Sequence, residues 1–332
     1  TETVNIDSNK NVIIDLAGKQ VNSISTTITN NGTLQITDTV GNGCIQSTLG
    51  SSIENNGSLE IKNGTIKGKI NAIKNTTSGN VTVENGTVIG DANGINSNGS
   101  VIVKGGVIES TTGEAIKAQA GSVTLGENDE IVKIDSPKIK GKTNGIDVNS
   151  EVEFNFYDGV ITAEDSTIVG NINNMPTGYN VQQTEENGIK TAILVIANYQ
   201  NTTTGSYFEK LNVAIENSKN ANIQNPNTIK VLNSTQETTT SNILETQKFI
   251  LNLNGKTVTL NGAIISNNGT LEIENSQQTG ELTSINLNTI KNTGTLTILS
   301  GTVNNTGNGV TIANTGITTV SGGVVNSSGT SN

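Results

Sequence analysis

The stretch Asn55–Gly68, NNGSLEIKNGTIKG, sets the pattern that the rest of the chain repeats. Leu59 and Ile61 alternate with charged residues, which is the period-two pattern of a strand with one buried face. Asn63 and Gly64 interrupt this strand, because both residue types tolerate the positive φ that a sharp corner requires. A second short strand follows at once. The stretch therefore predicts a strand, a tight corner and another strand.

The same phrase recurs as TSGNVTVENGTVIG (Thr77–Gly90), as SNGSVIVKGGVIES (Ser97–Ser110) and, more weakly, as QAGSVTLGEN (Gln119–Asn128). The anchoring glycines are Gly57, Gly79, Gly99 and Gly121, so the successive steps in numbering are 22, 20 and 22. Strands and corners at such a period are typical of a β-solenoid, in which stacked coils share a core that no single coil can bury. We predict an all-β fold, a right-handed parallel β-helix with coils of about 20–25 residues.

Stacking at this period predicts which side chains meet in the core. One expected column consists of Leu34, Leu59, Val81, Val101 and Val123, and a second consists of Ile36, Ile61, Val83, Val103 and Leu125. The outward residues that follow the second column, Lys62, Glu84 and Lys104, alternate in charge. We interpret them as a ladder that supports the register, with a binding stripe as the alternative.

Composition excludes several classes of function. The chain has 332 residues, of which 32% are hydrophobic and 2% aromatic, and it contains no His, Arg or Trp. Without His there is no Ser-His-Asp or Cys-His chemistry, and without Arg there is no bidentate clamp for phosphate. The net charge of −10 disfavours nucleic acid. Cys44 is the single cysteine, and no apolar run is long enough to cross a bilayer. We therefore expect no cofactor, no metal, no nucleic acid and no membrane insertion.

Three groups of residues are candidates for chemistry. Asp129, Glu130 and Asp135 follow the regular coils and carry oxygens of the kind that calcium takes, but their spacing matches no calcium motif, which favours a solvated loop. Phe154, Phe156 and Tyr157 concentrate aromatic side chains, either as a sugar-stacking platform or as the closure of the core. The remaining aspartates considered, Asp15, Asp38, Asp91, Asp147 and Asp158, fall at scattered phases and give no confident catalytic pair. We assign no catalytic, cofactor or metal residue.

The second part of the chain repeats the first. KFILNLNGKTV (Lys248–Val258) matches Asn11–Val21, and SNNGTLEI (Ser266–Ile273) matches TNNGTLQI (Thr29–Ile36). The offset in numbering is constant and needs no gap, since 268 − 31 and 325 − 88 both give 237. We expect residues 1–197 to form a first β-helix unit with a C-terminal cap, and residues 198–332 to form a second, truncated unit.

The second unit has its own expected start. By composition, Asn198–Gly205 is a linker. Residues 206–219 are the single helix candidate, because Phe208, Leu211 and Ile215 share one apolar face. Such a helix would cover the open end of the solenoid.

The order of these motifs resembles a known group. A short helix (YFEKLNVAI), then TIKVL, FILNLNGKTV, NNGTLEI, the NGT and GGV coils and finally FNFYDGVI is similar to the repetitive right-handed β-helix regions of large cell-surface proteins from low-GC Gram-positive bacteria. The resemblance covers nearly the whole chain. It implies an extracellular location at the cell surface or wall, an adhesin-like or stalk role, and no catalytic residues.

We therefore expect a structural or adhesive solenoid repeat and not an enzyme. It would act as an extended stalk or bind a polysaccharide, a host or a matrix surface, alongside further tandem units of the same chain. The alternative is a pectate-lyase-like polysaccharide lyase or glycoside hydrolase on the same fold. A third hypothesis, an ice- or mineral-binding face, needs regular Thr rows that the sequence does not keep at a fixed phase.

Overall fold

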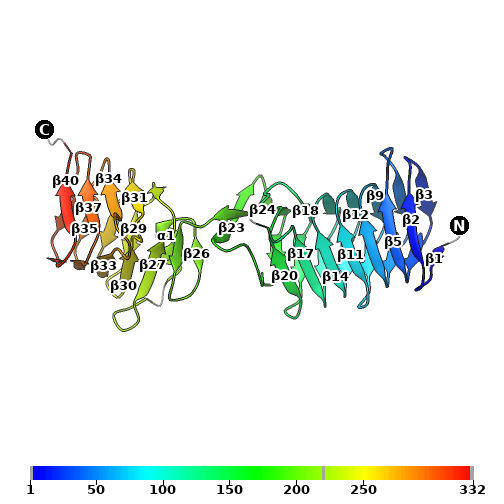
Figure 1. The fold of residues 1–332 in the computed structure, drawn as a ribbon, viewed down its shortest axis with the longest axis horizontal. Helices are drawn as coiled ribbons and strands as arrows, with labels where there is room; N and C mark the ends of the chain where they lie inside the picture. Colours follow the sequence, from blue (N-terminus) through cyan, green and yellow to red (C-terminus); the bar gives the residue numbers. More distant parts are fainter. Residues whose placement is uncertain (1–2, 130, 219–220, 330–332) are drawn as a thin grey trace. The chain divides into compact units, whose positions relative to one another are not determined.

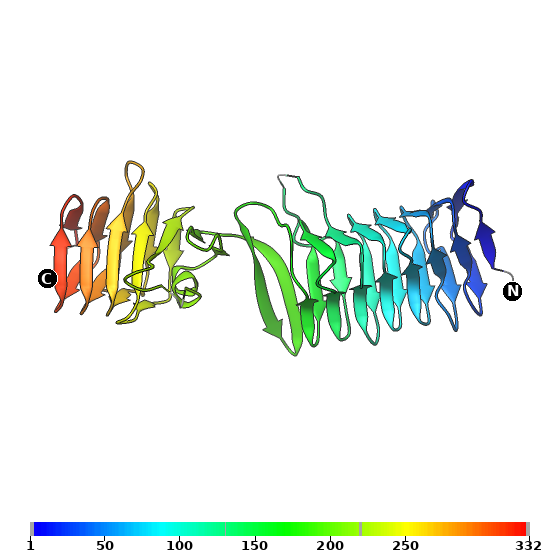
Figure 2. The ribbon, with the colours of Figure 1, turned by 90° about the horizontal axis from the view of Figure 1, so that it is seen from below.

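The computed structural model describes residues 3–129, 131–218 and 221–329. The chain is nearly all β, with 51% strand and 2% helix, and forms a β-solenoid of about 15 turns, which confirms the predicted fold class. It divides into two compact units: unit 1 comprises residues 1–177 and 181–194, and unit 2 comprises residues 178–180 and 195–332. Within each unit the strands stack coil upon coil (Figures 1 and 2).

Unit 1 is built from three sheets, to which the successive coils contribute strands in turn. The first sheet contains β1 (Val4–Ile6), β4 (Ile28–Asn30), β7 (Ile53–Asn55), β10 (Asn71–Asn75), β13 (Asn93–Ser97), β16 (Glu114–Ala118), β19 (Asn144–Val148) and β22 (Ser166–Val169). The second contains β2 (Asn11–Asp15), β5 (Thr33–Thr37), β8 (Ser58–Ile61), β11 (Asn80–Val83), β14 (Ser100–Val103), β17 (Ser122–Leu125) and β20 (Glu153–Phe156). The third contains β3 (Gln20–Ser23), β6 (Cys44–Ser47), β9 (Thr65–Gly68), β12 (Thr87–Gly90), β15 (Val107–Ser110), β18 (Lys138–Lys140), β21 (Val160–Ala163), β24 (Ile189–Ile196) and β23 (Tyr179–Glu186). β24 pairs with β21 antiparallel, so the parallel stacking of the third sheet ends there.

Unit 2 has the same three-sheet plan. Its longest sheet contains β26 (Tyr207–Phe208), β25 (Tyr199–Asn201), β27 (Asn227–Val231), β30 (Lys248–Asn252), β33 (Thr270–Glu274), β36 (Thr295–Ile298) and β39 (Ile317–Val320). The second contains β28 (Thr235–Glu237), β31 (Thr257–Leu260), β34 (Glu281–Ser284), β37 (Thr302–Asn305) and β40 (Val324–Ser327). The third contains β29 (Ser241–Ile243), β32 (Ile265–Asn267), β35 (Ile290–Asn292) and β38 (Ile312–Asn314).

Both predicted core columns are confirmed by the strand register. In the first column each residue pairs with the next one along: Leu34 with Leu59, Leu59 with Val81, Val81 with Val101 and Val101 with Val123. The second column pairs in the same way, through Ile36, Ile61, Val83, Val103 and Leu125. All ten side chains are at most 1% exposed. Parallel strands place equivalent residues directly above one another about 4.8 Å apart, so the period of the sequence becomes a continuous apolar column.

A buried asparagine ladder runs beside this apolar core. The side-chain amide of Asn30 donates to Asn55 Oδ1 at 2.7 Å, that of Asn55 to Asn75 Oδ1 at 2.8 Å, and that of Asn75 to Ser97 Oγ at 3.0 Å. Unit 2 repeats the ladder, from Asn267 to Asn292 and from Asn292 to Asn314, both at 2.7 Å. Because each of these donor amides also donates to a backbone carbonyl, the ladder ties the corner of one coil to the next.

Glycine is required in two corner columns for two different reasons. Gly64 has a φ of +92°, which is the left-handed conformation expected at that corner. Gly57 has no positive φ, but a Cβ there would lie 2.1 Å from the carbonyl oxygen of Gly32 in the neighbouring coil. The second column is therefore glycine because the coils approach too closely for any side chain.

The tandem repeat of the sequence extends to the strand boundaries. For example, Ile28–Asn30 and Ile265–Asn267 are corresponding strands, as are Ser58–Ile61 and Thr295–Ile298. The ladder departs from this rule at one step. Asn55 pairs with Asn75, whereas Asn292 pairs with Asn314, so the step in numbering is 20 in unit 1 and 22 in unit 2. The sequence repeat has no gap, yet the asparagine that continues the ladder is not at the equivalent position in the two units.

The start of unit 2 corrects two expectations. The helix α1 spans only Leu211–Glu216, because Tyr207 and Phe208 form strand β26 instead of a first helical turn. α1 buries Leu211, Ala214 and Ile215 against the core of unit 2, which agrees with the expected covering role. The expected linker is structured: β25 lies within it, and Tyr199 is fully buried.

The strand register of unit 1 predicts a distance that can be measured. Seven parallel steps link Asn5 on β1 to Val169 on β22. At about 4.8 Å per step, the two Cα atoms should lie about 34 Å apart. Spin labels at Asn5→Cys and Val169→Cys, in a Cys44→Ser background, should give one narrow distance distribution near this value by double electron–electron resonance. A broad distribution would contradict the rigid stacking of unit 1.

The asparagine ladder should contribute strongly to stability. Asn55→Ala removes the central link and leaves Asn30 Nδ2 and Asn75 Oδ1 facing an unfilled space. We expect the free energy of unfolding of unit 1 to fall by about 2–4 kcal/mol, measured by hydrogen exchange of the β8 and β11 amides, while unit 2 amides serve as an internal reference.

The matched control is Asn56→Ala, because Asn56 makes the same amide–amide contact with Asn31 at 2.9 Å but in solvent. Asn56→Ala should lower the free energy of unfolding of unit 1 by less than about 0.5 kcal/mol. Equal losses in the two variants would show that burial of the ladder has no special role.

Candidate functional site

Each of the five aspartates considered from the sequence is used in the scaffold. Asp15 and Asp38 meet at one corner, where they accept hydrogen bonds from the neighbouring Ala17 N and Gly18 N. Asp158 is 1% exposed and accepts hydrogen bonds from the backbone N–H groups of Glu127 at 3.0 Å and Lys133 at 2.7 Å, so it anchors the loop between β17 and β18. Asp38 holds a corner in the same way, accepting from Gly18 N at 2.7 Å and Gly43 N at 2.6 Å.

The other three aspartates lie at corners and edges of the coils. Asp15 accepts from the backbone and hydroxyl of Thr39, and these hydrogen bonds hold the pKa of its carboxyl below the usual range. Asp91 forms an ion pair with Lys69, whose hydrogen bond lowers the Asp91 pKa. Asp147 lies 3.6 Å from Lys117 Nζ. Each contact stabilises one coil against its neighbour.

The candidate calcium loop is not gathered around a common point. Asp129 accepts from Ile131 N at 2.9 Å and lies 3.6 Å from Lys133 Nζ, Asp135 is exposed, and Glu130 lies outside the described residues. Across residues 3–129, 131–218 and 221–329, no three acidic or cysteine side chains lie close enough together to hold a metal ion. In the same ranges, no helix has the length and apolarity needed to span a bilayer.

The aromatic cluster closes the core and is not a platform. Phe154 and Phe156 are fully buried, continue the two apolar columns above Val123 and Leu125, and stack at a centroid distance of 6.2 Å. A sugar ring therefore has no access to either face. Tyr157 is half-buried, and alone it does not form a platform.

The outward charge ladder is present in part. Lys104 Nζ lies 3.1 Å from Glu84 and 3.3 Å from Glu127, and its hydrogen bond with Glu84 raises its pKa. Lys62 pairs instead with Glu60 on the preceding strand, at 3.7 Å. The ladder therefore supports register over a few coils and does not form a continuous binding stripe.

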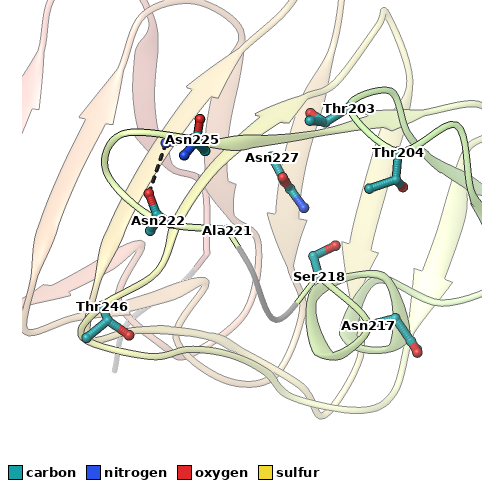
Figure 3. Close-up of a pocket in the computed structure, with 9 residues that line it drawn as sticks. All are labelled: Thr203, Thr204, Asn217, Ser218, Ala221, Asn222, Asn225, Asn227 and Thr246. Carbon is teal, nitrogen blue, oxygen red and sulfur yellow. Dashed lines mark hydrogen bonds between the residues drawn. The ribbon is translucent and has the colours of Figure 1, made fainter.

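An open concave site lies in unit 2, at the end of α1, where the sequence predicted no site. It is an open hollow of about 1110 Å³, lined by Thr203, Thr204, Asn217, Ser218, Ala221, Asn222, Asn225, Asn227 and Thr246 (Figure 3). We call it the cap hollow. These lining residues supply amides, hydroxyls and one alanine methyl group, and none of them is charged.

Asn201 does not line the cap hollow, but its buried side chain holds one wall of the hollow in place. Asn201 is 1% exposed; its Nδ2 donates to Ser218 Oγ at 2.8 Å, and its Oδ1 accepts from Thr203 N at 3.0 Å. Ser218 Oγ in turn donates to Ala214 O at 2.7 Å. These bonds fix the end of α1 against the turn after β25, so this wall is preformed.

Asn227 supplies the opposite wall. It is the first residue of β27 and shares the inward phase of Ile229 and Val231. It is 7% exposed. Figure 3 shows its side-chain amide pointing into the hollow, toward Ser218.

The cap also contains a buried titratable pair. The Tyr199 hydroxyl donates to Glu237 Oε1 at 2.8 Å, and both side chains are at most 2% exposed. Burial raises the pKa of the Glu237 carboxyl, and the hydrogen bond from Tyr199 opposes this only in part. Burial likewise raises the pKa of Tyr199, and the neighbouring Glu237 charge adds to the shift.

This pair predicts a pH dependence for unit 2. The folded pKa of Glu237 is above its ordinary value of 4.5, so between the two values the folded unit binds more protons than the unfolded chain. The stability of unit 2 should therefore rise as the pH falls through this window. Glu237→Gln should remove that contribution and retain an acceptor for Tyr199, which hydrogen exchange of β27 and β30 amides between pH 7 and pH 4.5 would measure.

Glu245→Gln, which changes an exposed carboxyl in the same unit, is the control. If Glu237→Gln and Glu245→Gln leave the same pH slope, the buried pair does not govern the cap.

Comparison with known proteins identifies no relative. No protein-family model, no curated protein and no solved structure matches the chain.

Proposed function

We propose that the chain is a structural and adhesive repeat region of a large cell-surface protein from a low-GC Gram-positive bacterium. In this role the solenoid is a stiff stalk that holds other modules outward and makes weak contacts with neutral glycans or matrix. The observation that carries the proposal is the recurrence of the same strands, at the constant sequence offset, in units 1 and 2. Repetition of whole coils with their register is what a structural array requires.

Stiffness follows from the way the coils are joined. Each coil is hydrogen-bonded to the next in three sheets, and the buried asparagine ladder adds side-chain bonds between coils. A flexible linker of the same length would have a broad distribution of end-to-end distances. A unit of stacked coils instead has one length, which suits a spacer outside the cell.

The contacts of the acidic residues also support a structural role. The five aspartates considered from the sequence all hold corners, loops or ion pairs. A polysaccharide lyase or hydrolase would need acids that converge on substrate. A net charge of −10 and a sequence rich in Asn, Thr and Ser favour contact with neutral, hydroxyl-bearing partners over anionic ones.

The proposal predicts retention without cleavage. The purified chain should be incubated with plant, host and bacterial polysaccharides, and both bound protein and released reducing ends should be measured. We expect weak retention on neutral polysaccharides and no release. Released oligosaccharide would overturn the structural role in favour of an enzyme, whereas no retention on any polymer would leave the stalk and remove the adhesive part.

A further inference from the structure

We propose that the first coil of unit 1, formed by β1, β2 and β3, is a docking surface for a second copy of the segment that covers the first coil of unit 2. This segment, residues 199–237, contains β25, β26, α1, β27 and β28, and we call it the cap segment. The inference goes beyond the proposed stalk role, because it assigns the contact through which one repeat unit is joined to the next.

The first coils of the two units correspond strand by strand. At the sequence offset of 237, the bounds of β1, β2 and β3 coincide with those of β29, β30 and β31. Inward residues are also alike, since Ile14 and Val21 of unit 1 correspond to Leu251 and Val258 of unit 2. The two coils therefore present the same kind of surface to the element that precedes them in the stack.

In unit 2 each strand of this coil is covered by one element of the cap segment. β27 pairs with β30 and places Ile229 beside Leu251, and β28 pairs with β31 and places Thr235 beside Val258. The third strand, β29, packs against α1. As a result, Leu251 and Val258 are at most 3% exposed.

In unit 1 the same coil has an exposed apolar edge. β1, β2 and β3 each lie at the end of their sheet, in the blue part of Figures 1 and 2. Val21 is 36% exposed where Val258 is fully buried, and Val4 is 46% exposed where Ser241 is 1% exposed. Folded proteins normally cover a sheet edge of this kind. The cover that fits this edge is the one that the cap segment supplies in unit 2.

The side chains of the two partners are complementary in this register. The hydroxyl of Ser241 is buried and has no hydrogen-bond partner among the residues that the structure describes, and the equivalent Val4 needs none. Lys230 on β27 pairs in register with Asn252, whose equivalent in unit 1 is Asp15. A cap segment docked in this register would set Lys230 beside a carboxylate, and opposite charges on neighbouring strands attract.

Two inward residues of the acceptor coil are smaller than their counterparts. Val12 stands where unit 2 has Phe249, and Ser23 stands where it has Leu260. A cap segment docked on unit 1 would therefore leave some space unfilled and bind less tightly than it does in unit 2. Attachment in the same chain compensates for this, because it gives the segment a high effective concentration.

The test joins a second cap segment to the full chain. Residues 195–237 are added directly before Thr1, so that residue 237 precedes Thr1 as it precedes Thr238 in unit 2. Docking should slow hydrogen exchange of the β1, β2 and β3 amides at least tenfold relative to the chain without the addition. The β30 and β31 amides, which are covered in both chains, are the internal reference.

Thiol labelling gives a second readout at one side chain. Val21→Cys, in a Cys44→Ser background, places the thiol at an exposed position, so this variant is expected to fold. The added cap segment should slow labelling at least tenfold, because the equivalent Val258 is fully buried beneath β28.

The matched control carries Leu211→Asp and Ile229→Asp in the added copy alone, so the native cap segment of unit 2 is unchanged. Both residues are buried in the core of unit 2, and carboxylates at these positions should prevent docking. Exchange and labelling of the first coil should then return to the rates of the chain without the addition. Lys230→Glu in the added copy sets two carboxylates side by side at Asp15 and should lose part of the protection.

Three results would overturn the inference: first-coil amides that exchange equally fast with and without the added segment, protection that the doubly substituted control or Lys230→Glu retains in full, or protection of β38, β39 and β40 in place of β1, β2 and β3. The stalk and adhesive role is tested separately by the polysaccharide incubations. The two proposals can therefore fail independently.

Discussion

Parallel stacking of coils at a spacing of about 4.8 Å governs where nearly every side chain of the regular coils lies. Because the backbone hydrogen bonds between coils run along the same direction, each side chain is placed directly above its counterpart in the previous coil. Apolar residues then form columns, as from Leu34 to Val123, and an amide meets an amide, as at Asn30 and Asn55. A side chain that does not suit its own column cannot be relocated without shifting the register.

The asparagine ladder shows how this stacking treats buried polar groups. An isolated buried amide would be destabilising, but in a stack each amide supplies the acceptor for the one before it and a donor for the one after it. Glycines at Gly32 and Gly57 let the corners approach closely enough for this to happen. The same geometry explains why the ladder persists at Asn75 and Asn314, although these two residues are not equivalent in the sequence repeat.

The cap of unit 2 follows different rules. Here α1, β25 and β26 have no counterpart in the regular coils, and their contacts join residues of unlike type: Tyr199 with Glu237, and Asn201 with Ser218. The column rule does not apply there. The cap can therefore bury the carboxyl of Glu237, which raises its pKa, and can place Asn227 in the lining of the cap hollow. Side-chain contacts between residues of unlike type are therefore found where the repetition stops.

Local sequence patterns were enough to specify the parts of the protein that repeat. The period-two alternation, the glycine spacing and the constant tandem offset predicted the solenoid, both core columns and the place of the covering helix, because a stacked coil is specified by its own local pattern. The length of α1, the strand at Tyr199 and the cap hollow around Asn227 emerged only in the folded structure. Their contacts join non-repeating segments that lie far apart in the chain, as Tyr199 and Glu237 do, and no periodic signal marks such a contact in the sequence.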